Sequence, residues 1–101
     1  MEVPAVSGAS LLWRGETLPL QEGESVLGRD EGATVFLDEA SVSRRHARIT
    51  VTGHSAVIED LDSRNGTFVR GTRVDGLVPL EDGDAIRLGW ARLVFRHPRH
   101  G

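Results

Sequence analysis

Cysteine and lysine are both absent from this chain of 101 residues. Without cysteine the chain can form neither a disulfide nor a cysteine-based zinc site, so a reducing compartment is allowed and we expect a cytoplasmic protein. All twelve cationic side chains are arginine, which fits a GC-rich and therefore bacterial genome. Any site for an anion must then combine arginine guanidinium groups with hydroxyls and backbone N–H groups.

Long apolar runs are also absent. No stretch approaches the roughly 18 apolar residues that a membrane span needs, and the N-terminus has neither the basic nor the apolar region of a signal peptide, so we expect no membrane partner. A net charge of −3 and an aromatic fraction of 5% argue against a nucleic-acid surface. No strand that exposes both aromatic and basic side chains is visible, which disfavours stacking on bases.

The sequence instead has the pattern of an all-β domain. Glycines recur at short intervals, and the segments between them alternate apolar and polar residues, as in 47–52 and 84–88. Alternation with a polar outer side is typical of antiparallel sheets that have one solvated face, and many short strands indicate a sandwich or small barrel. We expect strands at 10–14, 17–20, 25–28, 35–37, 47–52, 56–60, 67–69, 72–74, 77–79, 85–88 and 92–96.

A helix is the alternative for residues 38–48, where Asp38 could cap its first turn. The apolar residues of this segment are Ala40, Val42 and Ala47. They do not form the stripe of three- and four-residue spacings that an amphipathic helix needs. The pattern therefore favours a loop that leads into a strand.

Three polar segments follow or precede predicted strands, where side chains gather at one rim of a sandwich. Gly28-Arg29 ends a strand, and by itself it reads as a bulge glycine followed by a surface arginine. Ser43-Arg44-Arg45-His46 opens a strand and by itself reads as a polar loop, in which we expect His46 to brace two loops. Asn65-Gly66 contains the only asparagine and predicts a tight turn or hairpin, because both residues tolerate positive φ. Together the segments supply guanidinium, hydroxyl and amide donors, which is the chemistry that holds a phosphate.

In their order and spacing these segments resemble the forkhead-associated (FHA) domain family, over about residues 10–96. Residues 80–89 also resemble the late hairpin of that family. Arg70 departs from the pattern, since the family often has a second asparagine there. The resemblance rests on Gly28-Arg29, on Ser43 followed by His46, and on Asn65-Gly66-Thr67 after Asp60-Leu61-Asp62-Ser63.

The resemblance implies an eleven-stranded, antiparallel-dominated β-sandwich whose loops at one end bind phosphothreonine peptides. It implies a domain over 10–97, with an N-terminal extension at 1–9 and a C-terminal tail at 98–101. It also implies signalling with a Ser/Thr kinase or its substrate as partner, and we expect a monomer without cofactor. By match of position, Arg29, Ser43, Arg44 and Arg64 would bind the phosphate, Asn65 would hold the peptide backbone, and Gly28, His46, Gly66 and Thr67 would shape the loops.

Two other functions remain to be weighed. The same fold can serve as a phospho-independent interaction or oligomerisation module, although such a module should lose part of the set above. Ser43, His46 and Asp60 or Asp62 could be drawn as a hydrolase triad, but there is no Gly-x-Ser-x-Gly elbow. His54, His97 and His100 show no metal-ligand spacing, so we expect neither an enzyme nor a metal site.

Overall fold

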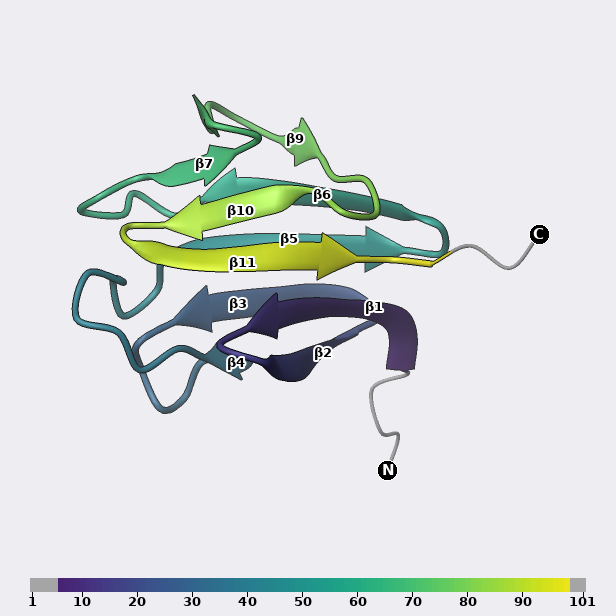
Figure 1. The fold of residues 1–101 in the computed structure, drawn as a ribbon, viewed down its shortest axis with the longest axis horizontal. Helices are drawn as coiled ribbons and strands as arrows, with labels where there is room; N and C mark the ends of the chain where they lie inside the picture. Colours follow the sequence, from purple (N-terminus) through teal and green to yellow (C-terminus); the bar gives the residue numbers. More distant parts are fainter. Residues whose placement is uncertain (1–5, 99–101) are drawn as a thin grey trace.

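The computed structural model describes residues 6–98 and shows two β-sheets packed face to face (Figure 1). One sheet has six strands in the order β2-β1-β11-β10-β7-β8, and the other has five in the order β4-β3-β5-β6-β9. Within residues 6–98 the strand pairs are antiparallel except β3 with β4. The strands are β1 (Val6–Trp13), β2 (Glu16–Gln21), β3 (Gly23–Gly28), β4 (Val35–Phe36), β5 (Ala47–Thr52), β6 (Ser55–Asp60), β7 (Thr67–Val69), β8 (Thr72–Arg73), β9 (Val78–Pro79), β10 (Ala85–Leu88) and β11 (Ala91–Arg96).

The predicted all-β sandwich of eleven strands is confirmed, because the alternating residues do face a common core. Along β5 and β11, buried residues alternate with half-buried or exposed ones. Leu11, Leu27, Ile49 and Phe95 come from both sheets and have no exposed surface. Residues 38–46 form no helix but an irregular loop that leads into β5, as the missing helical stripe indicated.

The first strand begins at Val6, four residues before the predicted start. Its pairing with β2 shifts register between Val6 and Ser10, and Gly8 within this irregularity has a φ of 84°. A bulge inserts an extra residue and so interrupts the period of two. Alternation, which was the signal for strands, therefore fails across this segment.

The prediction of a tight turn at Asn65-Gly66 is wrong. β6 belongs to the five-stranded sheet and β7 to the six-stranded sheet, so the segment between them crosses from one layer to the other and is no hairpin. Gly66 has a φ of 86°, whereas Asn65 is not among the described residues with positive φ. The two-residue hairpin lies instead between β7 and β8, where Arg70 and Gly71 have φ values of 52° and 82°, the signs of a type I′ turn.

Arg70 adopts this conformation although arginine rarely favours it. Its guanidinium group pairs with the carboxylate of Asp84, which is 8% exposed. The same carboxylate accepts the backbone N–H of Glu81 at 2.7 Å. The ion pair thus ties the β7–β8 turn to the loop before β10.

Several loops gather at one end of the sandwich, on the left of Figure 1. They are the segment after β3, the long β4–β5 loop, the β6–β7 crossover and the β10–β11 turn. The three polar segments that the sequence singled out therefore meet at one end of the sandwich.

Within residues 6–98, no helix is long and apolar enough to cross a membrane.

Candidate functional site

A shallow cavity of about 200 Å³ lies at the loop end. The cavity is lined by every residue for which the resemblance implied contact with phosphate or peptide. Three of its lining residues are arginines and none is an aspartate or glutamate, so its charge is opposite to the net charge of −3 of the whole chain. The lining consists of Arg29, Ala40, Ser41, Val42, Ser43, Arg44, Arg64 and Asn65.

Gly28 lets two loops approach closely enough to form this cavity. A Cβ atom at Gly28 would lie 1.8 Å from the carbonyl oxygen of Arg44, a distance that no side chain could occupy. The approach allows the backbone N–H of Arg29 to donate to the Ser43 carbonyl at 3.0 Å, and that of Asp30 to donate to the Arg44 carbonyl at 3.2 Å. Gly28 is thus required for its lack of a side chain and not for a positive φ.

Arg29 is exposed but oriented. Its Nε–H donates to the Val42 carbonyl at 3.1 Å, which fixes the plane of the guanidinium group and leaves the terminal nitrogens free to donate. Arg44 and Arg64 are also exposed, and neither forms an ion pair with the described residues. Three arginines therefore line the same small volume, and no aspartate or glutamate lines it with them.

The Ser43 hydroxyl is prepared to donate. Its oxygen accepts the backbone N–H of Arg64 at 3.0 Å. A hydroxyl has one proton and two lone pairs, so this bond occupies a lone pair and leaves the proton for an acceptor in the cavity. The same bond links the β4–β5 loop to the β6–β7 crossover.

The side-chain amide of Asn65 has one N–H group in a hydrogen bond within the protein and its other polar groups available to a ligand. Its Nδ2 donates one hydrogen bond to the Ser41 carbonyl at 2.8 Å. An asparagine amide has two donor hydrogens and an acceptor oxygen. One N–H and the oxygen are therefore left to pair with an extended peptide backbone.

Ser41 also lines the cavity, although the resemblance pointed to it only as a loop residue that could set selectivity and not as a ligand of the phosphate or the peptide backbone. Its hydroxyl donates to the carboxylate of Glu39 and accepts the backbone N–H of Trp90 at 2.8 Å. The hydrogen bonds from the hydroxyl and backbone of Ser41 lower the pKa of Glu39. Ser41 thereby joins the cavity to the β10–β11 turn, a contact between residues 49 apart in sequence that no local pattern could reveal.

His46 braces two loops from inside the protein. It has no exposed surface, and its Nδ1 accepts the backbone N–H of Ser43 at 2.9 Å. Because a backbone N–H can only donate, the ring proton lies on Nε2, which donates to the Gly66 carbonyl at 2.9 Å. Burial lowers the pKa of His46 and outweighs the opposing effect of the Gly66 carbonyl. The neutral tautomer therefore connects the Ser43 loop to the Asn65 loop.

Asp60 organises the crossover loop, a role that the sequence did not reveal. Its carboxylate accepts the hydroxyls of Ser63 at 2.5 Å and of buried Thr67 at 2.6 Å. It also accepts the backbone N–H of Ser63 at 3.0 Å, and the Ser63 hydroxyl accepts the N–H of Gly66 at 2.9 Å. Burial opposes ionisation of Asp60, but these hydrogen bonds outweigh it and lower its pKa. The network holds Arg64 and Asn65 at the cavity.

The hydrolase triad is not formed. His46 uses Nδ1 on the backbone of Ser43 and Nε2 on the Gly66 carbonyl, so neither nitrogen is left to activate the Ser43 hydroxyl. That hydroxyl instead contacts the backbone of Arg64. A nucleophile needs its base within hydrogen-bond reach, and here the histidine is already satisfied by backbone groups.

Comparison with known proteins agrees with this geometry. The sequence model of the FHA domain matches residues 25–89. FhaA of Mycobacterium tuberculosis is 42% identical over 82 residues, which are 81% of this chain and 15% of FhaA. GarA of Mycolicibacterium smegmatis is 38% identical over 81 residues, 80% of this chain and 51% of GarA. This chain thus spans about half the length of GarA and less than a fifth of FhaA.

Solved structures are similar to this chain in both fold and sequence. One comes from a structural and functional analysis of phosphothreonine-dependent FHA domain interactions. It has a TM-score of 0.84 and 38% sequence identity, and the matched region covers 92% of this chain and 97% of that one. Mycobacterium tuberculosis EmbR in complex with a low-affinity phosphopeptide has a TM-score of 0.83 and 40% identity, with coverage of 96% and 26%. The FhaA FHA domain complexed with the intracellular domain of Rv3910 has a TM-score of 0.82 and 38% identity, with coverage of 87% and 99%. This chain therefore belongs to the FHA domain family of non-catalytic modules for phosphothreonine-dependent protein interactions.

Proposed function

We propose that this chain binds phosphothreonine peptides in the cavity between the β4–β5 loop and the β6–β7 crossover. The observation that carries the proposal is the composition of this cavity, which has three arginines, a donor-ready serine and an asparagine, and no carboxylate. A phosphothreonine has close to two negative charges and three strong acceptor oxygens at neutral pH. The cavity is complementary to such a group in charge and in donors.

Arg29, Ser43, Arg44 and Arg64 bind the phosphate in this proposal. Arg29 donates from its terminal nitrogens, since its Nε is already bonded to the Val42 carbonyl. Ser43 donates its free hydroxyl proton, and Arg44 and Arg64 add charge from the sides. Charge-assisted hydrogen bonds of this kind are about twice as strong as neutral ones.

Asn65 binds the peptide backbone next to the phosphothreonine. Its remaining N–H and its oxygen pair with a peptide C=O and N–H, as at a strand edge. Gly28, His46, Gly66 and Thr67 act indirectly, because they fix the two loops that present these donors. The site is open at the surface, so binding should weaken as the salt concentration rises.

The partner would be a phosphothreonine-containing protein in a Ser/Thr kinase pathway, either a kinase or its substrate. We propose that the chain acts as a monomeric module in the cytoplasm of a bacterium. GarA, FhaA and EmbR come from mycobacteria, which supports a bacterial setting. Selectivity around the phosphothreonine would come from loop residues such as Ser41.

The proposal can be tested by titrating a phosphothreonine peptide and its unphosphorylated form against the wild type, with binding measured by calorimetry. We expect binding of the phosphorylated form to exceed that of the plain form, and Arg29→Ala to weaken it by about ten- to a hundredfold, the effect of losing one charged contact of about 1.5–3 kcal/mol. Arg45→Ala is the matched control, since Arg45 is exposed but does not line the cavity. Equal affinity for both peptides would instead support a phospho-independent module.

A further inference from the structure

The outer face of the six-stranded sheet has a row of large side chains at the loop end. Phe68 pairs with Arg73 on β8 and with Arg87 on β10, and Arg87 pairs with Arg92 on β11. The residues next to Phe68, Arg87 and Arg92 along their strands, such as Val69, are buried in the core, as is Val74 after Arg73. Because side chains alternate between the two faces of a sheet, these four lie side by side on the outside.

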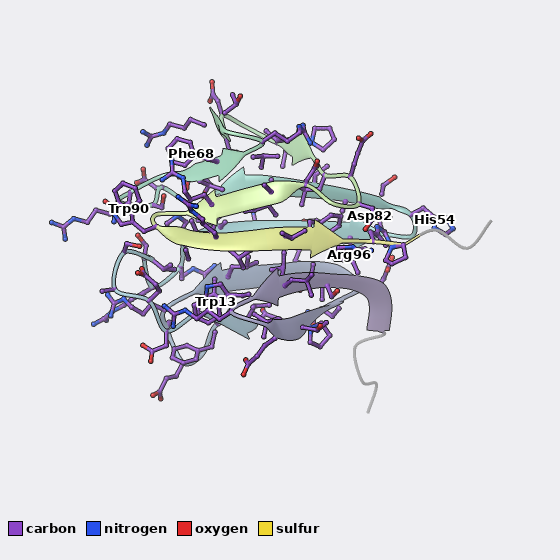
Figure 2. All side chains as sticks on the ribbon, viewed as in Figure 1. Trp13, His54, Phe68, Asp82, Trp90 and Arg96 are labelled. Carbon is purple, nitrogen blue, oxygen red and sulfur yellow. The ribbon has the colours of Figure 1, made fainter. Side chains whose placement is uncertain are left out.

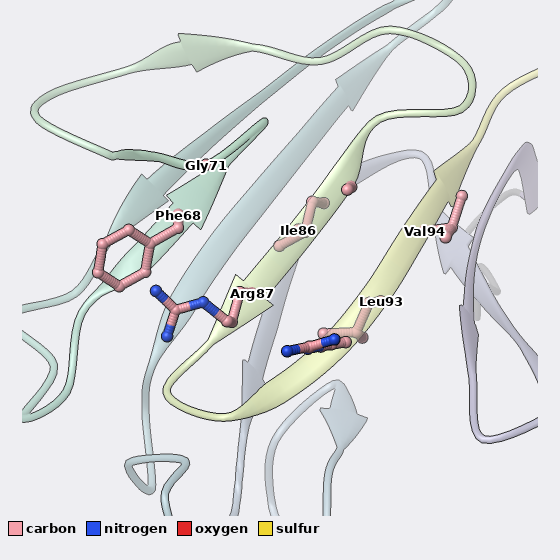
Figure 3. Close-up of a pocket in the computed structure, with 8 residues that line it drawn as sticks. Phe68, Gly71, Ile86, Arg87, Leu93 and Val94 are labelled. Carbon is pink, nitrogen blue, oxygen red and sulfur yellow. The ribbon is translucent and has the colours of Figure 1, made fainter.

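A cavity of about 440 Å³ lies on the same face, and its volume is more than twice that of the phosphate cavity. Figure 3 shows Phe68 beside Arg87 at one end, with Val94 on the neighbouring strand. Apolar atoms of Ala85, Val94 and Phe68 form much of the lining. The face therefore offers both an apolar recess and cationic groups around it.

The charge of this face is of one sign. β7, β8, β10 and β11 contain no aspartate or glutamate. Arg73, Arg87 and Arg92 form no ion pair with the described residues, whereas Arg96 pairs with Asp82 at the far end. Figure 2 shows Arg96 and Asp82 at the end opposite Phe68 and Trp90. In a chain of net charge −3, the positive charge here is complementary to an acidic partner.

Arg87 is held in place before any partner arrives. Its guanidinium carbon lies 4.0 Å from the centre of the Phe68 ring and 5.4 Å from that of Trp90, and its Nη1 donates to the Gly89 carbonyl at 2.8 Å. A side chain that is already ordered loses less entropy on binding. The stack also shows that the face combines aromatic and basic residues, which the sequence did not reveal because they come from separate segments.

This arrangement favours a protein over a nucleic acid. A guanidinium group already covers one side of the Phe68 ring, so that side is not free for a base to stack on. The recess is lined largely by apolar atoms and suits an apolar side chain, an anchor that nucleotides lack. The net charge of −3 also opposes binding to a polyanion.

The face continues into the phosphate cavity. Trp90 is 73% exposed, and its backbone N–H donates to the hydroxyl of Ser41, which lines that cavity. A Cβ at Gly89 would lie 2.4 Å from the Ser41 carbonyl, so the β10–β11 turn lies directly against the β4–β5 loop. A chain that leaves the phosphate cavity past Ser41 therefore meets Trp90 and then Arg87.

We propose that the outer face of β7, β8, β10 and β11 is a second docking surface, which binds an acidic segment of the same protein partner. One aliphatic or aromatic side chain of that segment fills the recess beside Phe68 and Val94. Carboxylates on either side of it pair with Arg73, Arg87 and Arg92. The proposal rests on the phosphothreonine site only for bringing the segment into reach.

The test uses a phosphothreonine nonapeptide selected from an oriented library, with and without a tail. The tail is a flexible Gly-Ser linker of about eight residues followed by Asp-Glu-Leu-Phe-Glu-Asp, attached at either end. A flexible linker gives a millimolar effective concentration, so a tail that binds with ~0.1 mM affinity tightens binding about tenfold. Tails with lysine for the acidic residues, or serine for Leu-Phe, should give no gain.

Variants of exposed residues locate the gain. Arg92→Glu and Ala85→Asp should abolish it and leave binding of the tail-free peptide unchanged. Arg92→Gln should reduce the gain, whereas Thr52→Glu, which changes net charge by the same amount on the opposite sheet, should retain it. No gain in the wild type, or a full gain in both face variants, would overturn the proposal.

A second measurement is independent of the phosphothreonine site. The tail sequence Asp-Glu-Leu-Phe-Glu-Asp is titrated into the protein as a free acetylated peptide, without linker or phosphothreonine. It should shift the backbone NMR signals of Ala85, Arg87 and Val94 and not those of Ser43. These shifts should persist in Arg29→Ala, which separates failure of the phosphate site from failure of this face. Absence of such shifts would overturn the proposal, as would tight binding of a single-stranded RNA that Arg92→Glu abolishes.

Discussion

Replacing Gly28 with alanine tests how the fold creates the cavity at the loop end, in which we propose that the phosphate binds. The new Cβ would lie 1.8 Å from the Arg44 carbonyl oxygen and 2.6 Å from its carbonyl carbon. Both atoms belong to the backbone, so no side chain can rotate away. To reach even 3.0 Å, the least that real Cβ contacts show, the carbonyl must move by about 1.2 Å. That shift breaks the hydrogen bond from Asp30 to Arg44, now 3.2 Å long.

We expect Gly28→Ala to lower the free energy of unfolding by about 1–3 kcal/mol, the usual cost of forcing extra atoms into a packed site. Displacement of Ser43 and Arg44 should remove at least one phosphate contact and weaken phosphopeptide binding by roughly ten- to a hundredfold. Urea unfolding and calorimetry would measure the two effects. Gly32→Ala is the matched control, since its Cβ would meet nothing closer than 3.6 Å. Equal stability and affinity of the two variants would refute this account of Gly28.

The remaining predictions concern the groups that support the two loops. His46→Ala should lower the free energy of unfolding by about 1–3 kcal/mol or more, because it leaves the Ser43 N–H and the Gly66 carbonyl without partners. Arg44 is exposed, so Arg44→Ala should change this free energy by about 0.5 kcal/mol or less. Melting curves in the opposite order would mean that their roles are reversed. Since burial lowers the pKa of His46 below 6.5, the unfolded chain binds its proton more readily. The stability that His46 contributes is therefore complete above about pH 6.5 and is lost as the pH falls through the folded pKa; urea midpoints across this range should drop in the wild type and drop less in His46→Asn. Asp60→Ala should reduce both stability and phosphopeptide affinity, because the Ser63 and Thr67 hydroxyls lose their acceptor; unfolding and titration curves like those of the wild type would contradict this role.

Residue order was sufficient to predict the strands. Alternation of apolar and polar residues is a local property with a period of two, and each of the eleven predicted segments overlaps an observed strand. The largest difference is at the first strand, which begins four residues before the predicted start, where the register shifts near Gly8. The candidate site residues were found through resemblance in three separated segments, and the structure brings Arg29, Ser43 and Asn65 to one cavity.

Contacts between distant segments could not be predicted in this way. Asn65-Gly66 has the local chemistry of a hairpin turn, yet its flanking strands belong to different sheets. Which strands pair depends on the packing of the whole core, and this overrides the turn preference. Asp60 and Ser41 gain their roles in the same way, since their partners lie on other loops.

The sequence by itself therefore determined the strand content, the family and the donors available for a phosphate, because these depend on residue type and short-range order. Only the tertiary structure decided that Gly28 is needed to admit the Arg44 backbone, that His46 is neutral with its proton on Nε2, and that Phe68, Arg87 and Trp90 form one face. Each of these depends on distances between segments far apart in the chain, which are set when the two sheets pack against each other.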